Sequence, residues 1–117
     1  MRKFLVFAAV LLFGTGIALV AQEGGGFTGP GLPQVSVKEA KKLIDDTPVL
    51  LRGHILRFLG DEKYLFSDDT GTVTVEIDDS LWRNLSVSEQ DKVEIVGEVD
   101  KKFLRVEIDV DSIKKLQ

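Results

Sequence analysis

The sequence predicts an all-β domain with short helices, folded as a small closed barrel. Five stretches after residue 48 alternate apolar and polar residues, as half-buried strands do. Two pairs of these stretches are separated by only a few turn-forming residues, which is typical of β-hairpins. A short helical pattern falls between the third and fourth stretches. Five strands with a helix in that place form the five-stranded Greek-key barrel known as the OB-fold.

The first 21 residues do not fit such a domain. Arg2 and Lys3 precede the uncharged run 4–21, which is mostly apolar and ends in small residues. This pattern is typical of a secretory signal peptide cleaved after Ala21, so we expect residues 1–21 to be removed and the protein to be periplasmic. The run is also just long enough for an uncleaved anchor, and a membrane would then be contacted through this segment only.

Residues 22–35 are expected to form a flexible linker, because they are rich in Gly and Pro and show no periodic pattern. Phe27 is the one residue in the linker that could dock on a surface. The ordered OB-fold domain is expected to span residues 36–117. The chain has no Cys, so disulfides and a lipoprotein anchor are excluded and the domain must rest on its hydrophobic core.

The charge of the mature chain argues against nucleic acid as a partner. Without residues 1–21 the chain keeps 13 basic and 19 acidic residues, a net charge of −6. Binding to a phosphate backbone needs a basic face. We therefore expect no nucleic acid partner.

Order is predicted to begin with a short amphipathic helix. Ser36 and Glu39 have the spacing of a capping box, in which each side chain accepts a hydrogen bond from the other's backbone. The helix should run to about residue 46, since Pro48 prevents it from continuing. Its buried face would consist of Ala40, Leu43 and Ile44.

The first three strands are predicted at Val49–Leu59, Lys63–Ser67 and Thr72–Ile77. Gly53 falls on the inward side of the first strand, which indicates a sharp bend or the close approach of another backbone. The turn at residues 68–71, DDTG, should be capped by Asp, with Gly71 in the left-handed conformation. The predicted inward residues are Val49, Leu51, Gly53, Ile55, Tyr64, Phe66, Val73, Val75 and Ile77.

Residues 78–85 break the alternation and predict one helical turn, capped by Asp79 or Ser80. This turn should place Trp82 under the barrel, as a plug of the core rather than as a platform for a ligand. The last two strands are predicted at Lys92–Val99 and Phe103–Val110, joined by a turn at residues 100–102. Their inward residues would be Val93, Ile95, Gly97, Val99, Leu104, Val106, Ile108 and Val110.

Several stretches also resemble a known family. They are GGFTGP at 25–30, DDTPVLLRG at 45–53, LGDEKYLFSDDTG at 59–71, VEIDD at 75–79 with Trp82 close behind, GEVDK at 97–101 and VEIDV at 106–110. With them the chain resembles the bacterial OB-fold (BOF) family, also called the YgiW/YdeI stress-tolerance family, over nearly its whole mature length. The resemblance implies a periplasmic OB-fold protein without enzymatic activity, associated with envelope or oxidative stress, whose ligand is not nucleic acid.

Ligands of OB-folds usually bind the outer face of the first strands. We therefore expect ligand contacts from six residues, with Phe58 included only if no bulge reverses the alternation after Gly53. One His and no Cys cannot form a typical zinc site or an identifiable catalytic triad. We expect no catalytic residue, no metal site and no cofactor. The six expected residues are Arg52, His54, Phe58, Leu65, Thr74 and Glu76.

Two features of this surface have alternative interpretations. His54 is interpreted as an ordinary surface residue, and a pH-dependent charge switch is the alternative. Acidic residues recur at alternate positions of three strands. They form either an ordinary solvated exterior with interleaved Lys and Arg, or a surface for divalent ions or cationic peptides. These acidic residues are Glu76 and Asp78, Glu94 and Glu98, and Glu107, Asp109 and Asp111.

The sequence as a whole predicts a non-enzymatic periplasmic binding protein involved in stress tolerance. Its ligand would be a small molecule, a cation or a cell-envelope component such as a glycan. The alternative is a protein-interaction module that docks on an envelope enzyme or a membrane partner through Phe27 and the acidic strands.

Overall fold

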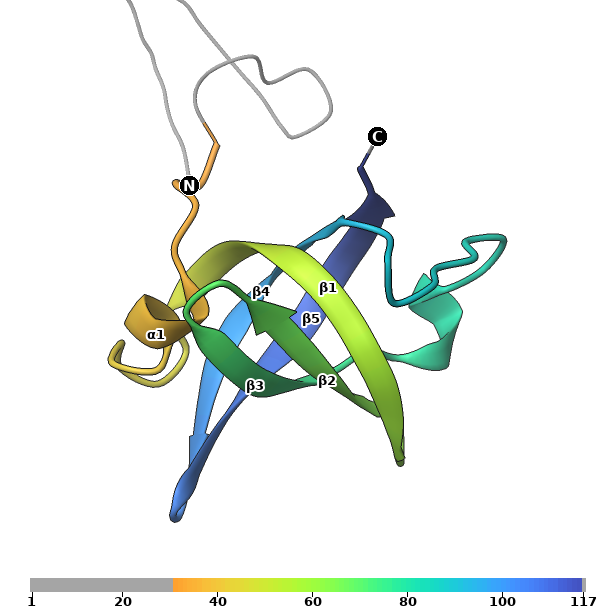
Figure 1. Cartoon of the computed structure of the whole chain (residues 1–117). Helices are drawn as coiled ribbons and strands as arrows, with labels where there is room; N and C mark the ends of the chain where they lie inside the picture. Colours follow the sequence, from red (N-terminus) through yellow and green to blue (C-terminus); the bar gives the residue numbers. More distant parts are fainter. Residues whose placement is uncertain (1–30, 117) are drawn as a thin grey trace, which may run out of the picture. The chain divides into compact units, whose positions relative to one another are not determined.

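A barrel of five strands forms the part of the chain that the computed structural model describes, residues 31–116 (Figure 1). The predicted signal peptide 1–21, Phe27 and most of the linker lie outside the described residues. The strand order around the barrel is β1-β2-β3-β5-β4, and β3 and β5 pair in parallel. This order confirms the predicted OB-fold. The elements are α1 (Val37–Ala40), β1 (Pro48–Gly60), β2 (Lys63–Asp68), β3 (Gly71–Glu76), the 3₁₀ turn η2 (Asp79–Leu81), β4 (Val93–Lys102) and β5 (Arg105–Lys115).

Pairing with the barrel begins slightly ahead of Ser36. Gln34 forms an isolated parallel bridge with Leu50 of β1. The backbone N–H of Val35 donates to the Leu50 carbonyl oxygen at 3.0 Å, and the Val35 side chain packs against the core. The last residues of the predicted linker are thus tied to the edge of β1.

The helix α1 begins with the predicted capping box but is much shorter than predicted. Ser36 Oγ accepts from the Glu39 N–H at 3.0 Å, and Glu39 Oε1 accepts from the Ser36 N–H at 2.8 Å. The helix ends at Ala40, because the following turns make tighter i to i+3 bonds and Asp46 N–H donates to the Val99 carbonyl of β4. Ile44, predicted to be buried, is 78% exposed.

The turn between β2 and β3 also holds the start of α1. Asp68 Oδ1 accepts from the Thr70 N–H at 2.8 Å, as the capping prediction requires. Its Oδ2 accepts from the Val37 N–H at 2.8 Å, so one carboxylate serves both the turn and the first turn of the helix. Gly71 has a φ of +157°, far from the left-handed helical value of about +57°, so the predicted left-handed conformation is wrong. Side chains other than glycine rarely adopt this φ, so the position still favours glycine.

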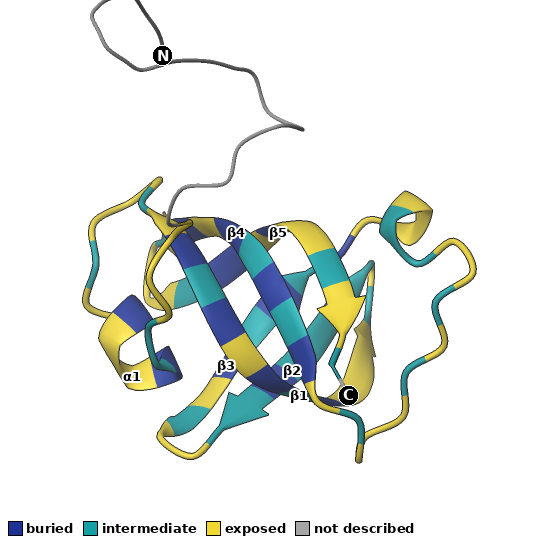
Figure 2. Cartoon of the chain, turned by 90° about the horizontal axis from the view of Figure 1, so that it is seen from above, coloured by how far each residue is buried: buried dark blue, intermediate teal, exposed yellow. Residues whose placement is uncertain are grey.

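The core is built from the inward side chains of all five strands and α1. Figure 2 shows the buried residues in dark blue on the strands and on α1. Buried and half-buried or exposed residues alternate along β3 and β4, as a barrel with a dry interior requires. All residues of the core cluster and those packed against it lie within residues 35–113. The predicted inward residues are confirmed, except that Tyr64 and Val106 are only half-buried and Leu104 is exposed.

Two glycines mark the places where backbones cross most closely. A Cβ atom on Gly53 would collide with the Ser67 carbonyl oxygen of β2, and one on Gly97 would collide with the Asp109 carbonyl oxygen of β5. The close approach predicted at Gly53 is therefore confirmed. At both positions a side chain of any size would push paired strands apart.

The β4–β5 hairpin is longer than predicted and turns at a different place. Pairing continues to Lys102 and Arg105, so the turn consists of Phe103 and Leu104 and not of residues 100–102. Leu104 keeps the alternation but is 88% exposed, because the hairpin projects beyond the barrel (Figure 1) and no core lies beneath it.

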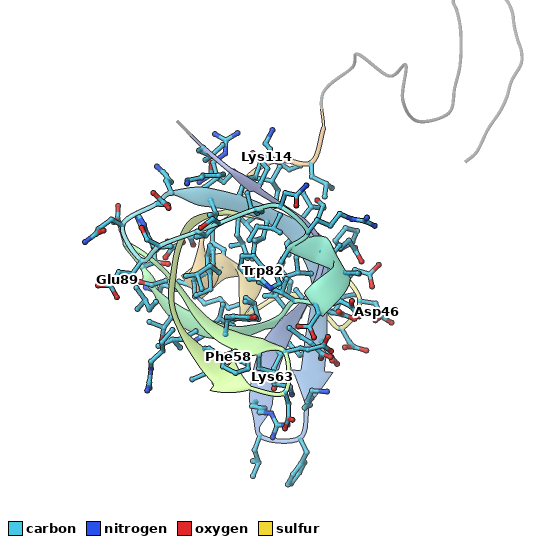
Figure 3. The ribbon with its side chains drawn as sticks, turned by 90° about the vertical axis from the view of Figure 1, so that its right-hand side faces the viewer. Asp46, Phe58, Lys63, Trp82, Glu89 and Lys114 are labelled. Carbon is cyan, nitrogen blue, oxygen red and sulfur yellow. The ribbon has the colours of Figure 1, made fainter. Side chains whose placement is uncertain are left out.

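Trp82 covers one opening of the barrel, as predicted (Figure 3). The 3₁₀ turn that carries it is capped by Asp78, whose Oδ1 accepts from the Ser80 N–H at 2.9 Å, and not by Asp79 or Ser80. The Trp82 side chain packs against the core and lies 5.3 Å from the ring centre of Tyr64. Its indole Nε1 is buried and has no hydrogen-bond partner among the described residues.

The close strand crossings give the first prediction. Gly53→Ala and Gly97→Ala should each lower the free energy of unfolding by about 2–4 kcal/mol, because the new methyl group meets backbone atoms that can move only with their strand. Chemical denaturation of each variant measures this. Gly31→Ala is the control: a Cβ there meets no atom within 4 Å, and its effect should stay within about 0.5 kcal/mol. Equal stabilities for Gly53→Ala and Gly31→Ala would contradict the account.

Candidate functional site

OB-folds commonly bind ligands on the outer face of β2 and β3 and on the adjoining loops. In this barrel that face is flanked by β1 on one side and β5 on the other. Its central row runs across four strands, because Arg57 pairs with Leu65, Leu65 with Thr74, and Thr74 with Glu107. Residues directly opposite each other in a sheet share one face. The neighbouring row, two residues away along β2 and β3, contains Lys63 and Glu76, which also lie opposite each other.

Three of the six predicted ligand residues meet on this face. Leu65, Thr74 and Glu76 are all half-buried and lie on the neighbouring strands β2 and β3. Lys63 and Glu107, which are not among the six predicted ligand residues, lie beside them. The structure thus joins part of the predicted set to Lys63, two residues before Leu65 on β2, and to Glu107 of the more distant strand β5.

Phe58 does not belong to this face. The β1–β2 register shifts between Ile55 and Arg57, so Leu56 is an extra residue and the alternation reverses after it. Phe58 pairs with Tyr64, and their ring centres lie 5.1 Å apart. The prediction of Phe58 as an outward residue beside Arg52 and His54 is therefore wrong. Phe58 is 61% exposed near the barrel end that Trp82 covers (Figure 3).

Arg52 and His54 both already have partners. Arg52 pairs with Glu94 of β4, and His54, whose backbone pairs with Ser67 of β2, contacts the segment just before β4 through its side chain. Arg52 binds Glu94, with Nη2 at 2.9 Å from Oε1. His54 is half-buried rather than a free surface residue, and its Nδ1 lies 3.0 Å from the Asp91 carbonyl oxygen. Since a carbonyl oxygen only accepts, Nδ1 is the donor in this contact. Both side chains fix the β1–β4 side of the barrel.

Glu107 is the most deeply buried charge of the described residues, with 3% of its surface exposed. Lys63 Nζ lies 3.0 Å from Oε1 and 3.1 Å from Oε2, and Arg105 Nε lies 2.9 Å from Oε2. Burial by itself raises the pKa of Glu107, but the hydrogen bonds and charges of Lys63 and Arg105 bring it below its usual value. Glu107 therefore stays ionised at neutral pH and links β2 to β5.

Three carboxylates lie side by side on adjacent strands, and we call them the acidic row: Glu76 of β3, Asp109 of β5 and Glu98 of β4. Asp109 pairs directly with each of the other two. None of the three belongs to an ion pair within residues 31–116. Directly opposed like charges destabilise a sheet. The nearest cation in the register is Lys63, opposite Glu76, but its Nζ is bound to Glu107, so the acidic row has no ion pair of its own.

The other predicted acidic residues behave as an ordinary exterior. Glu94 binds Arg52 and lies 3.6 Å from Lys114 Nζ, and Glu107 is held by its two cations. Asp111 is the extra residue of a bulge opposite Val96 and Gly97, so the even spacing of acids predicted along the last strand ends before it. The prediction of acidic stripes along single strands is replaced by one row across three strands.

Residues 31–116 contain no group of three or more His, Cys, Asp or Glu side chains that could hold a metal ion together. Within the same residues, no helix combines the length and the hydropathy of a membrane span.

The comparisons with known proteins agree with this fold. The family model described as bacterial OB fold (BOF) protein matches residues 16–115. Protein YgiW of Escherichia coli K12 is 40% identical over 129 residues, covering 99% of this chain and 98% of that protein. The calcium-regulated OB-fold protein CarO of Pseudomonas aeruginosa PAO1 is 36% identical over 119 residues, covering 100% of this chain and 98% of that protein. The solved structure of the hypothetical protein ygiW from E. coli has a TM-score of 0.72 and 47% identity, covering 80% of this chain and all of that one.

The buried carboxylate gives the second prediction. Glu107→Gln should lower the free energy of unfolding at pH 7 by about 1–2 kcal/mol, a fall in Tm of roughly 5–10 °C, because Lys63 and Arg105 lose their anion. Since the folded protein lowers the pKa of Glu107, its contribution is full at neutral pH and is lost as pH falls below about 4. The gap in Tm between the two proteins should therefore shrink on acidification.

Glu89→Gln is the matched control, because Glu89 is exposed and forms no ion pair within the described residues. We expect it to change stability by less than about 0.5 kcal/mol at either pH. A Glu107→Gln variant as stable as Glu89→Gln at pH 7 would show that the buried network does not support the barrel.

Proposed function

The chain belongs to the bacterial OB fold (BOF) family, and from this membership we propose that it is a non-enzymatic binding protein that takes a cationic ligand on the acidic row. The ligand would lie across β3, β5 and β4 and contact the outer face through Glu76. Leu65 and Thr74, next to Glu76 on that face, would contribute the less polar part of the contact.

One observation carries the proposal: Glu76, Asp109 and Glu98 oppose each other and none of them forms an ion pair within residues 31–116, while Lys63, which lies opposite Glu76, is bound to Glu107. A ligand with positive groups spaced like neighbouring strands would relieve this repulsion. Strands lie about 4.8 Å apart, which suits the repeated amines of a polyamine or the side chains of a Lys-rich peptide. The low exposure of Glu107 and its two cations leave it out of such a site.

A metal ion fits this surface less well. A hard cation such as Ca²⁺ needs six or more oxygen ligands that converge on one point. Carboxylates on the outer face of a barrel diverge, and residues 31–116 hold no suitable group of three. The name of the P. aeruginosa relative includes the words calcium-regulated, so Ca²⁺ is a useful competitor in the binding experiment.

Export to the periplasm and a part in stress tolerance belong to the same proposal. The support for export is the sequence pattern of residues 1–21, and the support for a stress role is the family resemblance. An acidic binding protein in the envelope would meet cationic peptides and polyamines before they reach the membrane. The second function considered from the sequence, docking on an envelope protein, would use Phe27 and the same acidic strands, and Phe27 lies outside the described residues.

The third prediction follows from the acidic row. In residues 22–117, Glu76→Gln/Asp109→Asn should weaken the binding of spermidine or a Lys-rich peptide by about tenfold or more, measured by calorimetry. The same variant should be slightly more stable than the parent, by about 0.2–1 kcal/mol, because an opposed like-charge pair is removed. Weaker binding together with higher stability is the pattern expected of a site whose charges serve a ligand.

Asp69→Asn/Glu89→Gln is the matched control, since it removes the same number of charges from exposed residues elsewhere on the domain. It should reduce binding by no more than about twofold through net charge alone. Equal losses of affinity in both variants would show that binding depends on net charge and not on the acidic row. If no polyamine, cationic peptide or Ca²⁺ gave a heat of binding, the proposal of a cationic ligand would be wrong.

A further inference from the structure

The tip of the β4–β5 hairpin exposes two large apolar side chains next to each other. Phe103 is 87% exposed and Leu104 is 88% exposed, and we call these two residues the hairpin tip. The hairpin reaches beyond the rest of the barrel (Figure 1). Single exposed apolar residues are common on protein surfaces, whereas an adjacent pair at the end of a projecting ribbon points to a partner.

The requirements of the turn do not explain these residues. Leu104 has a φ of +70°, a conformation that suits Gly or Asn and is unfavourable for Leu. The turn would therefore form more easily with a small or polar residue at this position. Because Leu104 is almost entirely exposed and its backbone conformation is unfavourable for Leu, a polar residue at this position would serve the fold at least as well.

The charge of the hairpin changes sign with distance from the tip: basic residues lie nearest to it and acidic residues lie farther along the strands. Nearest to it lie Lys101, Lys102 and Arg105, which we call the basic collar. The next pair, Asp100 and Glu107, is already neutralised, since Asp100 binds Lys102 and Glu107 binds Arg105 and Lys63. Lys101 is exposed and forms no ion pair within the described residues. The end of the hairpin is therefore positive, although the chain as a whole is acidic.

The unpaired acids lie farther back. Asp109 follows Leu104 by five positions along β5, which at about 3.3 Å per residue places it roughly 16 Å from the tip. Amphipathic segments bury their apolar face about 5–10 Å into the boundary between headgroups and acyl chains. A tip inserted to this depth would keep the acidic row in water.

We infer that the hairpin tip inserts into the surface of a bilayer that contains anionic phospholipids. Phe103 and Leu104 would enter the boundary between headgroups and acyl chains, and the basic collar would contact lipid phosphates. This contact is separate from the leader segment 1–21 and from the acidic row. It would hold the domain at a membrane surface with the acidic row facing the aqueous phase.

Vesicle co-sedimentation of residues 22–117 tests this inference. The core lies within residues 35–113, so this part folds without the apolar run 4–21, which would bind vesicles by itself. The protein should sediment with vesicles of phosphatidylcholine mixed with phosphatidylglycerol. It should sediment less with phosphatidylcholine alone and less at high salt. No sedimentation with the anionic vesicles would overturn the inference and favour a protein partner for the tip.

Substitutions locate the contact. Phe103→Ser/Leu104→Asn should reduce vesicle binding at least about tenfold, and the hairpin should still form because Asn tolerates a positive φ. Lys101→Gln should reduce it about fivefold. Leu56→Ser removes an exposed apolar residue of β1 and should change binding by less than about twofold. Wild-type binding by the double variant, with its thermal transition intact, would contradict the inference.

A fluorescent label reports insertion directly. The chain has no Cys, so Phe103→Cys provides one site for a polarity-sensitive fluorophore. Anionic vesicles should shift its emission to the blue, while the same label at Glu89→Cys should not respond. Equal responses at both positions, or none at residue 103, would exclude insertion of the tip. Neither result depends on whether spermidine binds the acidic row.

Discussion

The strands of this barrel can bend and close only because backbones lie in direct contact at Gly53 and Gly97. At these positions β1 lies against β2, and β4 against β5, more closely than any side chain would allow. This closeness lets the long strands bend around a small core, so that β5 can reach β3 and pair with it in parallel. The pairing of β1 with β4 and of β3 with β5 closes the barrel and determines which side chains become neighbours on the outer face.

The parallel pairing of β3 and β5 creates two electrostatic environments within a few residues of each other. One register position brings Glu107 beside Thr74, where Lys63 and Arg105 cover it. The position two residues later brings Asp109 beside Glu76 and Glu98, none of which forms an ion pair within the described residues, because Lys63 at the end of this row is bound to Glu107. The first arrangement supports the fold, and the second is open to a ligand. Beyond both, the hairpin tip and the basic collar reverse the sign of the surface at the end of the same strands.

Local patterns were sufficient for much of the fold. The inward residues of the strands, the capping box of Ser36 and Glu39, and the placement of Trp82 over the core all follow from spacings of a few residues. Local patterns do not show which strands pair with each other or in which register. The contact between Lys63 and Glu107 joins residues 44 positions apart and depends on the β3–β5 register. The alternation of apolar and polar residues along one strand does not show how that strand is aligned with another. One extra residue, Leu56, reversed the face of Phe58, and continued alternation hid the turn at Phe103 and Leu104.

A map of amide chemical shifts in residues 22–117, recorded during titration with spermidine, would locate the cationic ligand on the barrel. If the acidic row binds it, the largest shifts should occur at Glu76, Asp109 and Glu98 and their immediate strand neighbours, with a saturable dose response. Shifts concentrated around Arg52 and His54, or small shifts spread evenly over all acidic residues, would contradict binding at the acidic row.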